Sequence, residues 1–146
     1  MYDVQHRLDE LACLLRESGY RLTPQRLEVL RALIETKEHP SAETVYGRIS
    51  QRLPTTSLAT VYNTIEALKE LGQVLEVRPG AGPVRFDIRD PHRHPHLLCT
   101  QCGRVEDAAF AKQPSDPGLV VDGWRDLDVR LDFQGICPQC KEEARD

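Results

Sequence analysis

The sequence predicts an α+β protein, in which a helical N-terminal part that ends in a β-hairpin precedes a smaller, mostly stranded C-terminal part. Apolar residues recur at helical spacing through the first half of the chain, and alternation typical of strands begins after Gly72. Two Cys-x-x-Cys pairs then follow in the C-terminal third. At 146 residues, the chain has room for one or two small domains.

Four helices are predicted from the helical spacing of leucine, valine and isoleucine, the first from about Gln5 to Ser18 and the last from Leu58 to about Leu71. Helix starts are indicated by Thr23-Pro24, Ser41 and Thr55-Thr56-Ser57, and helix ends by Gly19, His39-Pro40, Pro54 and Gly72. Three short helices with tight connections before a longer one are typical of a helix-turn-helix core.

A β-hairpin is predicted directly after the last helix, because residues 74–77 and 84–88 alternate around a Gly- and Pro-rich turn. A hairpin at this place is a wing, so residues 1–84 are interpreted as a winged-helix domain. Residues 85–93 are expected to form a hinge that runs into the Pro- and His-rich segment 90–96, and residues 94–146 a second domain. In that domain we expect strands at 97–99, 103–107 and 129–133, and a loop at 112–118.

The net charge of −4 argues mildly against nucleic-acid binding, which usually goes with a basic surplus. The excess lies mostly in the second half: residues 1–84 hold ten Lys and Arg against eleven Asp and Glu, and residues 85–146 hold nine against twelve. The first half therefore permits DNA binding. No apolar run approaches a membrane span, and the N-terminus lacks the apolar segment of a signal peptide, so we expect a cytoplasmic protein with no membrane partner.

Four of the five cysteines form two Cys-x-x-Cys pairs, Cys99 with Cys102 and Cys137 with Cys140. Two such pairs supply the four thiolates of a tetrahedral zinc site, and a closed site of this kind is structural because it leaves no position for a substrate. The fifth, Cys13, is predicted to be a small buried residue of the first helix.

A second candidate metal site is formed by residues with nitrogen and oxygen donors. Its members are His39, Asp87, His92, His94, His96 and Asp107. His94 and His96 alternate, so on an extended segment both point to the same side. Donors without a thiolate suit ferrous iron or manganese better than structural zinc. Spacing alone does not attach His39 or Asp87 to this site.

The start of the fourth helix carries a polar face, with Ser57, Thr60, Tyr62, Asn63 and Thr64. Such side chains can reach phosphates and base edges, and they are equally compatible with a solvated helix face. The position between a short helix and a wing favours a recognition helix. We expect Tyr62 and Asn63 to face the major groove, and Arg16, Arg21 and Arg26 to contact phosphates or the minor groove.

Motifs along the whole chain give it a resemblance to the ferric uptake regulator family. They are Arg21-Leu-Thr-Pro-Gln-Arg26, His39-Pro-Ser-Ala-Glu-Thr-Val-Tyr46, Ala59-Thr-Val-Tyr-Asn63, Arg85-Phe-Asp87, His94-Pro-His96-Leu-Leu-Cys99-x-x-Cys102-Gly103 and Gly135-x-Cys137-Pro-x-Cys140. The resemblance implies a homodimer with an N-terminal winged-helix domain that binds a pseudo-palindromic double-stranded DNA operator, and a C-terminal α/β dimerisation domain.

Within that family the chain looks most similar to the peroxide-sensing repressors. Their regulatory site of three His and two Asp corresponds here to His39, His94, His96, Asp87 and Asp107, whereas iron-sensing members more often have Glu at the two acidic positions. The resemblance implies a structural Zn²⁺, a regulatory Fe²⁺ or Mn²⁺, and oxidation of His39 or His94 by peroxide.

The chain also departs from the family pattern. The usual dimerisation-domain helix is shortened around residues 113–119, residues 124–130 hold no His for a further metal site, and His92 has no assigned role.

Three alternatives remain open at this point. The first is a manganese, iron or zinc homeostasis sensor of the same family. The second is a small non-haem metalloenzyme, against which a set of five ligands argues because catalysis needs open positions. The third is a zinc-ribbon interaction module without a switch, which leaves the helical domain unexplained.

Overall fold

The computed structural model of the chain describes residues 3–80, 82–89, 94–108, 121–125, 127 and 130–144. Contacts divide this part into two compact units. Apart from the hairpin turn, the described residues up to 89 form the first unit, and those from 94 onward form the second. Within the described ranges, no helix combines the length and the apolar character that crossing a membrane requires.

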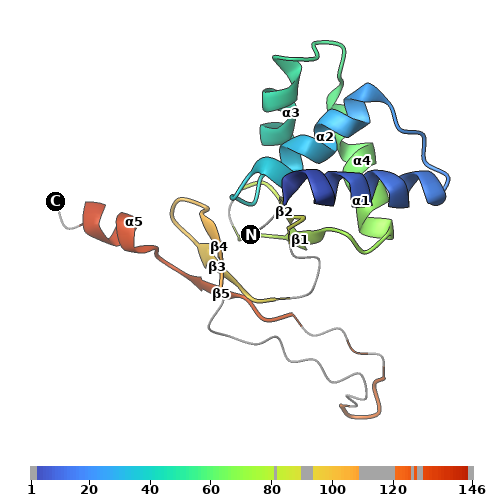
Figure 1. The fold of residues 1–146 in the computed structure, drawn as a ribbon. Helices are drawn as coiled ribbons and strands as arrows, with labels where there is room; N and C mark the ends of the chain where they lie inside the picture. Colours follow the sequence, from blue (N-terminus) through green and yellow to red (C-terminus); the bar gives the residue numbers. More distant parts are fainter. Residues whose placement is uncertain are drawn as a thin grey trace. The chain divides into compact units, whose positions relative to one another are not determined.

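The first unit is built on four helices, α1 (Val4–Glu17), α2 (Pro24–Glu35), α3 (Ala42–Ser50) and α4 (Leu58–Glu70) (Figure 1). The predicted N-caps are confirmed, because Thr23, Ser41 and Ser57 each accept a hydrogen bond from the backbone N–H three residues further on. Gly19 and Gly72 follow α1 and α4 with φ values of +87° and +66°, a conformation that favours glycine after a helix.

All four helices and the hairpin contribute to the core of the first unit. Its largest fully buried side chains include Leu11, Leu15, Leu30, Leu33, Ile34, Ile65, Leu68 and Ile88. Cys13 is exposed, so the prediction that it is buried is wrong. At about 100° per residue, Cys13 lies about 200° from both Leu11 and Leu15, which places it on the opposite face of α1.

The predicted hairpin is present as β1 (Leu75–Val77) and β2 (Arg85–Asp87), which pair antiparallel with Leu75 opposite Asp87. Strand β2 takes up the first three residues of the hinge expected over 85–93, so the first unit continues past residue 84. Residues 90–93 of that hinge, which include His92, lie outside the described residues.

The second unit contains β3 (His96–Cys99), β4 (Val105–Asp107), β5 (Phe133–Gly135) and the short helix α5 (Pro138–Glu143) (Figure 1). The sheet has the order β4-β3-β5, with β3 antiparallel to β4 and parallel to β5. Few apolar side chains are buried among the described residues of the second unit: Leu98, Val105 and Ala108, with Cys99 and Cys140. The described part of this core is small for an independently stable domain.

The bounds predicted for the last strand are wrong. Residues 129–133 alternate, and a strand is expected there, but this range overlaps β5 only at Phe133. The position of β5 is set by its pairing with β3, in which Phe133 lies opposite Leu97 and Gly135 opposite Cys99. The sequence did not indicate α5, and the strand expected at 103–107 begins only at Val105. Val129, the loop expected at 112–118 and the shortened helix around 113–119 lie outside the described residues.

Candidate metal centres and nucleic-acid interface

The four paired cysteines of the second unit form one cluster. Cys99 ends β3 and Cys102 follows in the next turn, while Cys137 precedes α5 and Cys140 lies within it. The parallel pairing of β3 with β5 brings the two Cys-x-x-Cys segments together, and all four Sγ atoms lie within 4.8 Å of one another. The structure therefore unites all four predicted zinc ligands.

The spacing of the sulfurs fits a tetrahedral metal ion. The Sγ atoms of Cys99 and Cys140 are 4.0 Å apart, and those of Cys102 and Cys137 are 3.8 Å apart, with all four thiols free. A tetrahedron with Zn–S bonds of about 2.3 Å has its sulfurs about 3.8 Å apart. The four sulfur donors and the distances between them both suit zinc.

Hydrogen bonds prepare part of the cluster as thiolate. Backbone N–H groups, first that of Cys102 and then that of Cys137, lower the pKa of the Cys99 thiol to about 6, and the N–H of Cys137 lies 3.3 Å from its sulfur. The pKa of Cys140 is raised to about 12, first by its hydrogen bond with Cys137 and then by burial. Four adjacent thiolates repel one another, so a bound cation is needed to hold them all ionised.

In the first unit, His39 and Asp87 form a buried pair. Their side chains are 8% and 5% exposed, and His39 Nε2 lies 3.2 Å from Asp87 Oδ2. Two hydrogen bonds hold the segments that carry them: the Arg85 guanidinium donates to the His39 carbonyl at 2.9 Å, and the Phe86 N–H donates to the Pro40 carbonyl at 3.0 Å. The loop before α3 is thereby fixed against β2.

In the second unit, His94, His96 and Asp107 lie together across the β3–β4 pair, where His96 is opposite Asp107. The two imidazole rings are 4.5 Å apart, which confirms that both side chains point to the same side. Asp107 Oδ1 is 3.1 Å from His94 Nε2 and 3.7 Å from His96 Nε2. These donors suit a divalent iron or manganese ion.

Asp132 contacts the same histidine and was missed by sequence reasoning. Its Oδ1 accepts a hydrogen bond from the His96 backbone N–H at 3.1 Å and lies 3.4 Å from His96 Nδ1. A carboxylate at Nδ1 fixes the ring and directs Nε2 toward a ligand site, as is common for histidines that bind metal. Asp132 carries no motif, and only the pairing of β5 with β3 brings it near.

The described residues of the first unit also carry the expected DNA-contacting side chains. Tyr62 and Asn63 are exposed on α4, and Ser57 is exposed at its N-cap, where its hydroxyl lies 3.0 Å from that of Thr60. Thr64 is fully buried and donates its hydroxyl to the Thr60 carbonyl, so its assignment to the polar face is wrong. Positions 61, 64, 65 and 68 share the buried stripe of the helix.

The three arginines differ in their surroundings. Arg16 and Arg21 are exposed, whereas Arg26 is half-buried, donates to the Arg21 carbonyl at 2.7 Å and lies over the Tyr20 ring. Arg26 therefore braces the loop before α2, in addition to any contact with DNA.

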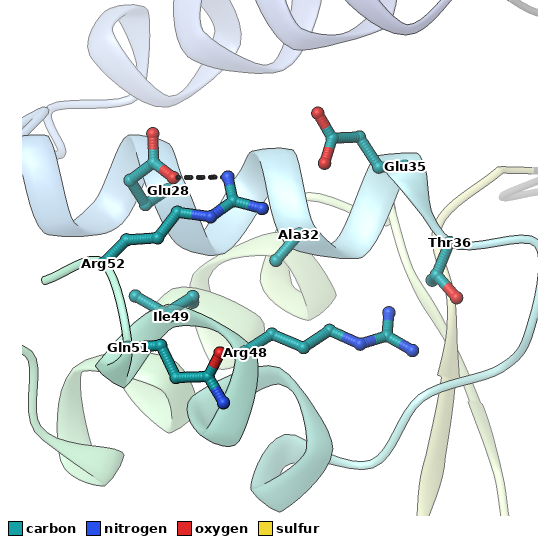
Figure 2. Close-up of a pocket in the computed structure, with 8 residues that line it drawn as sticks. All are labelled: Glu28, Ala32, Glu35, Thr36, Arg48, Ile49, Gln51 and Arg52. Atoms are coloured by element: carbon teal, nitrogen blue, oxygen red, sulfur yellow. Dashed lines mark ion pairs between the residues drawn. The ribbon is translucent and has the colours of Figure 1, made fainter.

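A surface pocket of the first unit contains none of the predicted site residues. It is lined by Glu28, Ala32, Glu35, Thr36, Arg48, Ile49, Gln51 and Arg52 (Figure 2). An ion pair of 3.7 Å joins Glu28 to Arg52 beside it. Because acidic and basic side chains balance each other there, the pocket presents no charge of one sign to a ligand.

A helical domain with a β-hairpin wing, joined to a small domain that holds a four-cysteine cluster, defines a metal-binding winged-helix regulator. Residues 17–133 match the model of the ferric uptake regulator family. The chain belongs to this family, whose members are transcriptional regulators and not enzymes. The predicted family, the predicted fold class and the prediction that the chain is not an enzyme are thereby confirmed.

Two solved structures and one relative show how far the similarity extends. The peroxide-responsive repressor PerR of Staphylococcus epidermidis is 36% identical over 144 residues, which covers 97% of this chain and 95% of that protein. The ferric uptake regulator Fur of Helicobacter pylori has a TM-score of 0.73 at 19% identity, over 95% of this chain and 94% of that one. A zinc uptake regulator complexed with zinc and DNA has a TM-score of 0.66 at 22% identity, over the whole of both chains. These two structures share the fold.

Proposed function

We propose that the chain is a peroxide-responsive repressor that binds a pseudo-palindromic operator as a dimer while a regulatory iron or manganese ion is bound. The ligands of that ion are His39 and Asp87 of the first unit and His94, His96 and Asp107 of the second. The observation that carries the proposal is the buried His39–Asp87 pair. It adds one imidazole and one carboxylate to the His94, His96 and Asp107 group of the other unit, which makes up the proposed set of five ligands. The 36% identity to a peroxide-responsive repressor supports the same assignment.

The ion acts as a staple in this proposal. Asp87 ends β2, and His94 comes seven positions later along the chain, so one ion bound by both groups restricts the two units to one arrangement. In a dimer that arrangement sets the distance between two recognition helices, which must match two operator half-sites. An ion that binds only this arrangement shifts the population toward the form that binds DNA.

The second unit is proposed to form the dimer interface. Leu97, Phe133 and Ile136 are exposed there, although large apolar side chains favour burial. Leu97 and Phe133 lie side by side on β3 and β5, beside the apolar groove that Ile136 also lines. We place the protein in the cytoplasm, which its membership of a family of DNA-binding regulators supports.

Replacing Tyr62 with alanine should remove discrimination between operator and random DNA. The exposed phenol on α4 is assigned to base edges in the major groove, where a good bidentate contact is worth about fivefold to 150-fold in discrimination, an upper bound for one phenol. Fluorescence anisotropy with operator and scrambled duplexes over a range of salt concentrations measures both affinities. Arg16→Ala is the comparison: it should weaken both affinities alike and flatten the salt dependence. Normal operator selectivity in Tyr62→Ala would show that α4 is oriented differently.

Brief exposure to hydrogen peroxide should add one oxygen atom to His39 or His94 in the iron-loaded protein, and not in the manganese-loaded protein. A bound ferrous ion would provide the redox chemistry, giving one electron to peroxide and regaining it as the ring is oxidised, which manganese and zinc do not readily do under the same conditions. The net reaction converts an imidazole C–H to C–OH with one peroxide consumed and one water released, a two-electron oxidation of the ring. The oxidised ring is a poorer donor, so the ion is lost and the operator is released.

Peptide mass spectrometry, with operator binding measured on the same samples, tests this mechanism. Oxidation of cysteine alone that follows the loss of DNA binding would contradict it. Exposed Cys13 is the first cysteine to examine, because thiolates are oxidisable. If neither residue type changes and the iron-loaded protein keeps its operator, the chain is instead a metal homeostasis sensor of the same family.

A further inference from the structure

Tyr62 makes a specific side-chain contact within the first unit. Its hydroxyl donates a hydrogen bond of 2.6 Å to Oε1 of Glu43. Glu43 lies in the first turn of α3 and Tyr62 in the second turn of α4, two helices that pack against each other (Figure 1). Tyr62 is 40% exposed, so its hydroxyl is held by Glu43 while part of the residue remains accessible.

The proton of this hydrogen bond belongs to the phenol. The pKa of Glu43 is lowered, first by the hydrogen bond from Tyr62, and the pKa of Tyr62 is raised by the same bond. The Glu43 contribution to stability is therefore present above the ordinary carboxylate pKa and lost as pH falls through its lowered value. The Tyr62 contribution is present below the ordinary phenol pKa and lost as pH rises through its raised value. At neutral pH the pair is an ionised carboxylate and a neutral phenol.

We propose that Glu43 fixes the polarity of the Tyr62 hydroxyl, so that Tyr62 reads DNA as a hydrogen-bond acceptor. The inference rests on the proposed function, in which Tyr62 faces the major groove. A phenol has one proton to donate, and when a carboxylate holds that proton the oxygen can only accept. Glu43 is thus a positioning residue that sets the specificity of Tyr62.

The consequence for base selection follows from the edges of the bases in the major groove. Adenine N6 and cytosine N4 carry donors, whereas guanine presents the acceptors N7 and O6. A hydroxyl that only accepts can bond to adenine or cytosine and is repelled by guanine, and the negative charge of Glu43 acts in the same sense. The ring edge remains available for a thymine methyl group. Tyr62 should therefore exclude guanine at the base that it contacts.

The test is selection of binding sites from a pool of randomised duplexes by the manganese-loaded dimer, with binding of the selected duplexes measured afterwards. The position that Tyr62 contacts is the one whose base preference changes in Tyr62→Ala. In the wild-type protein guanine should be depleted there. Glu43→Ala should raise the relative affinity for guanine at that position by about two- to tenfold, the worth of one hydrogen bond. Glu43→Gln retains an acceptor oxygen and should keep more of the discrimination than Glu43→Ala.

A double-mutant cycle separates this role from a structural one. In Tyr62→Phe the hydroxyl is absent, so adding Glu43→Ala should change the base preference no further. Glu38→Ala is the charge control. Glu38 is exposed and pairs with Arg48, and its replacement removes one negative charge from the same unit, as Glu43→Ala does. That variant should leave the base preference unchanged, even if removal of an acidic group strengthens binding to all duplexes.

The possible failures are distinguishable. An unchanged preference in Tyr62→Ala would overturn the proposed orientation of α4 itself. A change in Tyr62→Ala without a change in Glu43→Ala would overturn the inference about Glu43 alone. An equal loss of affinity for every duplex in Glu43→Ala, with preference retained, would assign Glu43 a structural role. As a readout without DNA, ultraviolet titration should show the pKa of Tyr62 returning toward its ordinary value in Glu43→Ala, because Glu43 is the group that raises it.

Discussion

Replacing Cys137 with serine is expected to abolish zinc binding and unfold the second unit. Among its described residues that unit has few buried apolar side chains, so the proposed zinc ion is expected to supply much of its stability. Structural zinc contributes about 10–16 kcal/mol in zinc-finger peptides, whereas whole domains have net stabilities of about 5–15 kcal/mol. Cys137 also donates its backbone N–H to the Cys99 sulfur, so both Cys-x-x-Cys segments are coupled through it.

Zinc content measured after dialysis against a chelator, circular dichroism and the mass in solution together test this prediction. Wild-type protein should retain one zinc ion per chain and remain dimeric. Cys13→Ser is the matched control, because it makes the same change at an exposed cysteine of the first unit and should leave zinc content and mass unchanged. A stable, zinc-free dimer of Cys137→Ser would refute the structural role of the cluster.

Replacing His39 with alanine is expected to remove the dependence of operator binding on the regulatory metal. The change leaves the four cysteines and the second unit intact, so zinc and the dimer should be retained. It deletes the ligand that comes from the loop before α3 and leaves Asp87 as the single proposed ligand of the first unit. Loss of a residue that merely supports a ligand costs about 10- to 100-fold in metal affinity, so loss of the ligand itself should cost at least about 100-fold.

Fluorescence anisotropy of a labelled operator titrated with manganese measures this effect. His6→Ala is the matched control: His6 is exposed on α1 and should respond to manganese like the wild type. Thermal unfolding of His39→Ala shows whether the first unit remains folded, since His39 is buried. Equal operator affinity of the wild-type protein with and without manganese would refute the staple mechanism, and a normal manganese response of His39→Ala would remove His39 from the ligand set.

Local features were predictable because their causes lie within a few residues. In the caps at Thr23, Ser41 and Ser57, the side-chain hydroxyl accepts a hydrogen bond from the backbone N–H three residues later. All three caps are present as predicted. The two Cys-x-x-Cys pairs indicated a single metal cluster, because their chemistry has few other uses at that spacing. By itself, the sequence determined the four helices of the first unit, the hairpin and the four-cysteine cluster.

Features that depend on partners far along the chain were decided by the tertiary structure. Alternation over 129–133 predicted a strand, but alternation does not specify a partner or a register, and pairing with β3 placed β5 at 133–135. That register brings Asp132 to His96, 36 positions away, and the loop before α3 meets β2 so that His39 reaches Asp87, 48 positions away. The contact between Glu43 and Tyr62 depends likewise on how α3 packs against α4. Such contacts follow from the relative placement of whole elements. The residue pattern within one element does not specify which other element packs against it.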